Sequence, residues 1–312
     1  MAPHGMPMNG EALPEAALPE TAVRGALAEA GLDPDGVDAL IRQALAEDLG
    51  PGVDVTSVAT VPAEQRATLD LTARAAGVVA GLPVAGRVFE LASEAPMEVV
   101  LVRADGHRVA RDDVVLSATG PTRALLVAER TALNLLCHLS GVATATAAWA
   151  DALVGTRARV RDTRKTTPGL RALEKYAVRC GGGVNHRMGL WDAALVKDNH
   201  VVAAGGVAQA FAAVRARFPG VPVEVEVDSL EQLAEVVEAG ADLVLLDNFT
   251  PELTAEAVGL VAGRCQLESS GGLSLAVAGA YARTGVDFLA VGALTHSAPV
   301  LDLGADLRTV EG

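Results

Sequence analysis

The chain has 312 residues, of which half are hydrophobic and only 3% aromatic, and its formal net charge is −14. The acidic balance argues against a general nucleic-acid or membrane-surface binder, and the scarcity of aromatic residues argues against a protein that stacks bases. The length favours one large domain plus a smaller one. The three cysteines match no metal or disulfide spacing, which indicates a reduced, cytoplasmic protein.

The first part of the chain predicts a small α+β domain. Residues 1–20 are rich in Pro, Ala and Glu, and we expect a disordered tail there. Residues 21–49 have the apolar spacing of two short helices. From 68 to 120, short Val-, Leu- and Thr-rich runs are broken by Gly, Pro and Asp, as in an antiparallel α+β sandwich. A helix is expected from Arg123 to His138 and another beyond Gly141, so this domain is predicted to span residues 21–140.

The second part alternates strand-like and helical segments. Six strands are expected, at residues 158–163, 193–197, 221–228, 242–247, 265–269 and 288–292. This alternation predicts a parallel sheet, with polar residues gathered where each strand ends. A doubly wound sheet would place them similarly, but no GxGxxG follows a first strand. We therefore expect an incomplete, TIM-like parallel α/β barrel of six or seven strands over residues 141–312.

A basic stretch between Arg157 and Arg187 stands out against the acidic whole. It carries nine Lys or Arg residues and two acids, and it and the following strand hold all three lysines of the chain, Lys165, Lys175 and Lys197. A solvated basic face is the ordinary interpretation of such a run. Here the charges are interleaved with the sequences DTRKT, GGG, NHR and KDNH. A solvated basic face has no need of these Gly, Thr, Asn and His residues, so the pattern favours an anion-binding active site.

Carboxylates and glycine-rich loops extend the predicted site. In VEVEVD, Glu224, Glu226 and Asp228 alternate with valines, so the three acids should share the inward face of a strand. Glu226 and Asp247, near the ends of neighbouring strands, could hold Mg²⁺ or sugar hydroxyls, and a salt-bridged structural network is the alternative. The loops at 268–274 and 291–297 have the character of paired phosphate cradles after the last strands of a barrel.

These blocks also carry a resemblance. DTRKTTPGLRALEKYAVRCGGGVNHRMGLWDAALVKDNH, with ERTALNLL before it and EVEVDSLEQL, LLDNF, SSGG and VGALTHS after it, resembles the quinolinate phosphoribosyltransferase family from residue 40 to 305 or so. The resemblance implies an enzyme of NAD biosynthesis that joins quinolinate to phosphoribosyl pyrophosphate, with release of pyrophosphate and CO₂. It further implies Mg²⁺ as cofactor, and a homodimer or a larger homo-oligomer, such as a hexamer, with shared active sites. No nucleic-acid or membrane partner is implied.

The resemblance also assigns roles to individual residues. Those expected to bind quinolinate are Arg130 (donated from the neighbouring subunit), Thr163, Arg164, His186, Arg187 and Lys197. Those expected to bind phosphoribosyl pyrophosphate are Lys165, His200, Glu226, Asp247, Ser270, Gly271, Gly272 and Gly292. The catalytic set is expected to be Lys165, Lys197, Glu226 and Asp247, of which the two acids would also hold the metal, directly or through water.

Three other functions fit the same residues less well. One is a related phosphoribosyltransferase of the same fold, of the nicotinate or molybdenum-locus type. Another is a barrel aldolase that forms a Schiff base through Lys165 or Lys197. The last is a binding protein without activity on this scaffold.

Overall fold

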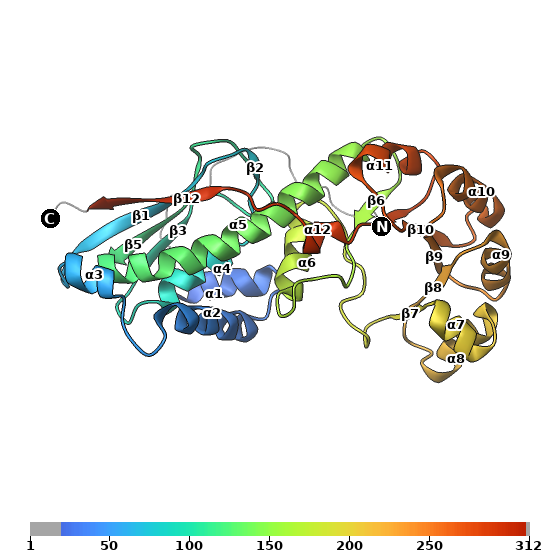
Figure 1. The fold of residues 1–312 in the computed structure, drawn as a ribbon, viewed down its shortest axis with the longest axis horizontal. Helices are drawn as coiled ribbons and strands as arrows, with labels where there is room; N and C mark the ends of the chain where they lie inside the picture. Colours follow the sequence, from blue (N-terminus) through green and yellow to red (C-terminus); the bar gives the residue numbers. More distant parts are fainter. Residues whose placement is uncertain (1–19, 310–312) are drawn as a thin grey trace. The chain divides into compact units, whose positions relative to one another are not determined.

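The computed structural model of the protein describes residues 20–309, which form two compact units (Figure 1). One unit holds the described chain up to Ser140 together with the C-terminal segment from Leu301, and the other runs from Gly141 to Val300. The tail predicted over residues 1–20 lies outside the described residues, apart from Glu20 at the start of the first helix.

The first unit is an antiparallel sheet with helices packed against it. Its helices are α1 (Glu20–Glu29), α2 (Pro34–Leu49), α3 (Val55–Thr60) and α4 (Leu82–Leu91). The sheet has the order β12-β1-β5-β3 and is made of β1 (Arg66–Ala73), β3 (Glu98–Leu101), β5 (Val114–Pro121) and β12 (Leu303–Thr309). A separate pair is formed by β2 (Gly77–Val78) and β4 (Arg108–Val109). Helix α4 packs on β3 and β5 and contacts α1 and α2.

Local sequence explains how this unit forms. Leu69, Leu71 and Ala73 alternate along β1 and are buried beneath the helices, as the period of a half-buried strand requires. Helix α2 begins after Asp33, whose side chain accepts hydrogen bonds from the first free backbone N–H groups, and Pro34 occupies the first turn.

The second unit is built from strand–helix repeats. Its strands are β6 (Arg159–Arg161), β7 (Ala194–Val196), β8 (Val223–Val227), β9 (Leu243–Asp247), β10 (Gln266–Ser270) and β11 (Phe288–Ala290). Its helices are α6 (Arg171–Cys180), α7 (Asp198–Ala204), α8 (Val207–Arg217), α9 (Leu230–Glu238), α10 (Pro251–Val261), α11 (Leu275–Ala282) and α12 (Ala293–His296). All six strands run parallel, as predicted, and their order in the sheet is β6-β11-β10-β9-β8-β7.

The sheet of the second unit curves without closing. Figure 1 shows α8, α9 and α10 outside the curve. Alternate residues of each strand face the inner side. Register pairs Glu226 with Leu245 and Leu245 with Glu268, so these side chains share the inner face, whereas Val225 and Val244 are buried toward the helices. Beyond β6, one further parallel bridge joins Arg161 to Val184. The result is the predicted incomplete barrel.

Several expectations were wrong in detail. The two helices expected around Gly141 form one continuous helix, α5 (Thr122–Ala152). Glycine is a poor helix former, which is why a break was expected at this position. The glycine is needed here because the backbone at Pro299 lies so near that a side chain at 141 would collide with it. Helix α6 begins at Arg171, after a turn that includes Pro168. Helix α7 was not expected, because none of its residues is buried and its sequence therefore has no apolar stripe.

The end of the chain also differs from the division expected at residue 140. Strand β12 pairs antiparallel with β1 from Ala67–Thr309 to Ala73–Leu303, so the segment after Val300 belongs to the first unit and not to the barrel. A pairing between residues more than 200 positions apart leaves no local signal in the sequence.

Within residues 20–309, no helix is both long and apolar enough to cross a membrane.

Candidate active site

A cavity of about 340 Å³ lies over the carboxyl ends of the barrel strands. Ten of the predicted site residues line it: Thr163, Arg164, Lys165, His186, Arg187, Lys197, Glu226, Asp247, Ser270 and Gly271. The remaining lining residues are Leu195, Leu245, Glu268 and Ala290. Residues predicted from six separate stretches of the sequence are thus brought together on one face, the face where barrel enzymes carry their chemistry.

Arg164 and Arg187 give the cavity its anion-binding character. The Nε atoms of both guanidinium groups are buried and have no hydrogen-bond partner among the described residues. Nη1 of Arg187 donates to the carbonyl of Ala193 at 3.1 Å. Burial and the neighbouring charge of Arg164 lower the pKa of Arg187. Two cations held close together and only partly neutralised favour a ligand with more than one negative charge.

The loop that carries Arg164 is braced from helix α6. Arg171 donates from Nε to the hydroxyl of Thr166 at 3.0 Å and from Nη2 to the carbonyl of Arg164 at 3.4 Å. The same guanidinium donates to the carbonyl of Met188 at 3.2 Å, in the loop that follows Arg187. One side chain therefore ties together both segments that supply the cavity arginines.

A buried ion pair fixes the segment before Arg187. Lys175 and Asp162 are both fully buried and form a short ion pair. Asp162 also accepts from the backbone N–H of His186 at 2.8 Å and from the side chain of Asn185 at 2.6 Å. Lys175 donates to the carbonyl of His186 at 3.0 Å. Of the three lysines, Lys175 thus has a structural position, whereas Lys165 and Lys197 line the cavity.

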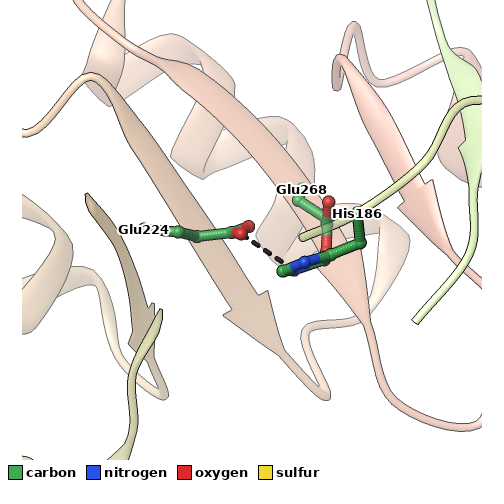
Figure 2. Close-up of side chains that lie close together, drawn as sticks. All are labelled: His186, Glu224 and Glu268. Atoms are coloured by element: carbon green, nitrogen blue, oxygen red, sulfur yellow. Dashed lines mark ion pairs between the residues drawn. The ribbon is translucent and has the colours of Figure 1, made fainter. Parts of the chain in front are cut away.

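A buried cluster is formed by His186, Glu224 and Glu268 (Figure 2). Nε2 of His186 is 2.9 Å from Glu224 and 3.7 Å from Glu268, and Nη1 of Arg161 is 2.6 Å from Glu268. Burial lowers the pKa of His186 to about 4 and raises those of both glutamates to about 7, against the attraction of Arg161. The ligand atoms of the three residues lie within 4.8 Å of one another, close enough for a metal, but the Arg161 guanidinium already supplies the compensating positive charge.

A second group of charges surrounds Lys197. Its ammonium is 2.7 Å from Glu226, and burial together with the charge of Glu226 raises the pKa of Asp247. Glu226 and Asp247 also line an adjoining hollow of about 210 Å³. Their carboxylate oxygens are the hard ligands that Mg²⁺ prefers, and both carboxylates line the same two hollows. The residues present therefore fit a bound Mg²⁺.

The two glycine-rich loops differ in how closely they approach the cavity. Gly271 lines it in a left-handed conformation with φ of 100°, and a side chain there would collide with Asn248. Gly292 lies beside Lys165, since a Cβ added to it would be 3.0 Å from Cδ of that lysine. The hydroxyl of Thr295 in the same loop donates to the carbonyl of Lys165 at 2.8 Å. Gly272 and Gly292 are not among the residues that line the cavity.

Three other predicted residues occupy different places. His200 is exposed and accepts from the backbone N–H of Lys197 at 3.0 Å through Nδ1, so it caps helix α7 and lies outside the cavity lining. Arg130, on α5, lines a hollow in the first unit with Asp48 and Asp54. Asp228 was expected to face inward, but β8 ends at Val227 and Asp228 is exposed.

The sequence did not single out Arg161, Asp162 or Glu268 as site residues. Arg161 and Glu268 fall inside predicted strands, where alternating charge is also typical of a solvent-facing edge. One signal was available: both residues lie two positions before a residue that lines the cavity, Thr163 and Ser270, and residues two apart on a strand share a face.

Known proteins resemble both parts of the chain. Family models described as the N-terminal and C-terminal domains of quinolinate phosphoribosyl transferase match residues 54–140 and 142–306. The nicotinate-nucleotide pyrophosphorylase (carboxylating) of Mycobacterium leprae is 55% identical over 271 residues, which cover 86% of this chain and 95% of the relative. A probable nicotinate-nucleotide pyrophosphorylase (carboxylating) of Bacillus subtilis is 39% identical over 269 residues, covering 86% and 92%.

Solved structures agree with these relatives. The crystal structure of NadC from Streptococcus pyogenes is 43% identical and superimposes with a TM-score of 0.86, covering 90% of this chain and 99% of that chain. The nicotinate-nucleotide pyrophosphorylase of Francisella tularensis is 38% identical with a TM-score of 0.84, covering 88% and 96%. The matches extend over both units and include every segment that lines the cavity. The chain therefore belongs to the quinolinate phosphoribosyltransferase family.

Proposed function

We propose that the protein transfers the phosphoribosyl group of phosphoribosyl pyrophosphate to quinolinate and releases CO₂, which yields nicotinate mononucleotide and pyrophosphate. One observation carries the proposal: Arg164 and Arg187, whose buried Nε atoms have no partner among the described residues, line a cavity together with two lysines and three acids. Adjacent carboxylates on a planar ring match a pair of guanidinium forks. The names of the relatives support the same reaction.

The charged groups divide into two sets along the cavity. Arg164, Arg187 and the hydroxyl of Thr163 would hold the dicarboxylate, while Lys165 and the Gly271 loop would receive the phosphate groups of the donor. Glu226 and Asp247 would hold the ribose hydroxyls and Mg²⁺. When bound, Mg²⁺ would neutralise charge on the departing pyrophosphate.

The chemistry needs little covalent help from the protein. The ring nitrogen of quinolinate forms a bond to C1 of the ribose while the bond from C1 to pyrophosphate breaks. The carboxylates of Glu226 and Asp247 lie where they can offset positive charge that develops on the ribose, and Lys165 and Lys197 can stabilise the leaving anion. Once alkylated, the ring nitrogen carries a positive charge. That charge stabilises the electron pair left on the neighbouring ring carbon when its carboxylate departs as CO₂, and this carbon then takes up a proton.

The active unit is proposed to be at least a homodimer, in which Arg130 of one subunit completes the site of its neighbour. The support is that Arg130 matches a family position of this kind and does not line the barrel cavity. We also infer that the enzyme works in the cytoplasm. Its three cysteines, all within the described residues, form no disulfide, which suits a reducing compartment.

A direct assay tests the proposal. Purified protein would be supplied with phosphoribosyl pyrophosphate, Mg²⁺ and either quinolinate or nicotinate, and nicotinate mononucleotide and CO₂ would be followed. We expect turnover with quinolinate alone. Turnover with nicotinate alone would retain the phosphate site but overturn the role of the arginine pair. Absence of turnover in both, from folded protein, would overturn the proposed reaction.

A further inference from the structure

Both ring nitrogens of His186 have partners within the chain. Its Nδ1 accepts the backbone N–H of Arg187 at 2.7 Å, and its Nε2 is 2.9 Å from Oε2 of Glu224. The side chain is only 7% exposed, and its backbone is held on both sides by Asp162 and Lys175. The ring therefore links the backbone of Arg187, which lines the cavity, to the buried carboxylate of Glu224.

The direction of the two hydrogen bonds fixes the tautomer of the ring. A nitrogen that accepts a backbone N–H carries no proton, so Nδ1 is unprotonated. Burial lowers the pKa of His186 to about 4, which leaves the ring neutral near pH 7 with its single proton on Nε2. The Nε2–H group faces Glu224, whose Oε2 accepts a hydrogen bond from it. In the opposite tautomer, an N–H at Nδ1 would point at the N–H of Arg187 and the hydrogen bond between them would be lost. The contact with Arg187 therefore depends on a hydrogen-bond acceptor, Glu224, that faces Nε2 and keeps the proton there.

Glu224 is a costly residue at this place. It lies on the inner face of β8 with 4% of its side chain exposed, close to a second buried carboxylate, Glu268. Arg161 lies 3.7 Å away and partly offsets this cost, and Oε1 of Glu224 has no partner among the described residues. An apolar side chain would pack with less penalty, so stability does not account for a glutamate here.

We propose that Glu224 is a positioning residue for the dicarboxylate site: it holds His186 in the tautomer that accepts the Arg187 amide, and so aims the Arg187 guanidinium into the cavity. The inference rests on the proposed function for its substrate, but the tautomer does not. Arg161 acts one step further away, because its Nη1 lies 3.7 Å from Glu224 and 2.6 Å from Glu268. The arrangement resembles the outer contacts that orient histidines in other active sites.

Two variants and a matched control test the proposal. Glu224→Ala removes the acceptor, whereas Glu224→Gln keeps an oxygen that can accept from Nε2. The control is Glu235→Ala, an exposed glutamate on α9. With quinolinate as substrate, we expect Glu224→Ala to raise the KM for quinolinate about tenfold, the loss of roughly one hydrogen bond to a charged group, with less than about a twofold change in the KM for phosphoribosyl pyrophosphate. Glu224→Gln should restore most of the difference. A merely structural role would instead lower the melting temperature and weaken both substrates alike, and that result would overturn the proposal.

A measurement on the unmutated protein keeps the test independent of folding and of turnover. Nitrogen-15 NMR of the six histidine rings distinguishes protonated from unprotonated ring nitrogens, and His186→Gln identifies the signal of residue 186. We expect an unprotonated Nδ1 and a protonated Nε2. A protonated Nδ1 would overturn the inference whether or not quinolinate is the substrate. If the wild-type enzyme has no turnover while the tautomer is as expected, the proposed function fails and the positioning of Arg187 by Glu224 stands.

Discussion

At the scale of single residues, we propose that the arginine pair decides which substrate the cavity accepts. Arg164→Ala removes one guanidinium fork, so the KM for quinolinate should rise by about 30- to 160-fold, the effect of losing a charge-assisted hydrogen bond of roughly 2–3 kcal/mol. Binding of phosphoribosyl pyrophosphate, measured by calorimetry, should stay nearly unchanged. Arg159→Ala, an exposed arginine on β6, is the matched control. Equal loss of affinity for both substrates would contradict the assigned role.

A second residue-scale prediction concerns pH. Burial and the charge of Glu224 raise the pKa of Glu268 to about 7, against the attraction of Arg161 and His186. Between about pH 4.5 and 7 the folded state therefore binds more protons at Glu268 than the unfolded state does, and stability falls as pH rises through this window. Glu268→Gln should remove that part of the fall, so the variant should gain up to about 3 kcal/mol over wild type between pH 4.5 and 8.

Urea unfolding of wild type and Glu268→Gln at pH 4.5, 6 and 8 would measure this difference. Glu235→Gln, on the exposed face of α9, should run parallel to wild type. A difference between Glu268→Gln and wild type that stays constant across the three pH values would show that Glu268 does not titrate in this range.

The sequence predicted the residues at strand ends better than those inside strands. Arg164, Lys197 and Asp247 stand where a parallel strand stops, so their chemistry points to the open face of the barrel. Glu268 lies within β10, and its burial follows only from the curvature of the whole sheet, which gathers the inner faces of separate strands. The contact between His186 and Glu224 joins a loop to a strand, and no spacing in the sequence encodes it.

At the scale of elements, the period of hydrophobic residues was enough to locate all six barrel strands, but not to decide where helices stop. Helix α5 continues through Gly141, and a contact distant in sequence explains the glycine. A Cβ at 141 would lie 2.2 Å from the carbonyl oxygen of Pro299. Gly141→Ala should therefore destabilise the protein by about 1–3 kcal/mol, although alanine is the better helix former.

Gly259→Ala provides the matched control for this prediction. Gly259 lies in α10, is exposed, and has open space where a Cβ would be added. Alanine there should stabilise the protein by about 0.5–1 kcal/mol. Thermal unfolding of both variants would measure the opposite signs. A stabilising Gly141→Ala would mean that the Pro299 segment does not constrain the helix.

At the scale of the whole molecule, the chain is predicted to be incomplete as a single copy. Arg130 lines a hollow in the first unit, whereas Lys197 lines the barrel cavity of the second. If Arg130 serves the barrel of a neighbouring subunit, Arg130→Ala and Lys197→Ala subunits should each be inactive alone. Mixed in equal amounts and allowed to exchange, they should recover roughly a quarter of wild-type activity, because half of the dimers are mixed and each mixed dimer has one intact site of two.

A different pair of variants separates a shared site from any general benefit of mixing. Lys165 and Lys197 both line the same barrel cavity, so Lys165→Ala and Lys197→Ala damage the same part of every site. In a mixed dimer of these two variants each site still lacks one lysine, and activity should not return. Recovery in the Arg130 mixture without recovery in the lysine mixture would establish that Arg130 acts across subunits. If verified mixed dimers of Arg130→Ala and Lys197→Ala stay inactive, each barrel must instead work with residues of its own chain, and Arg130 must be assigned to the hollow in the first unit that it lines.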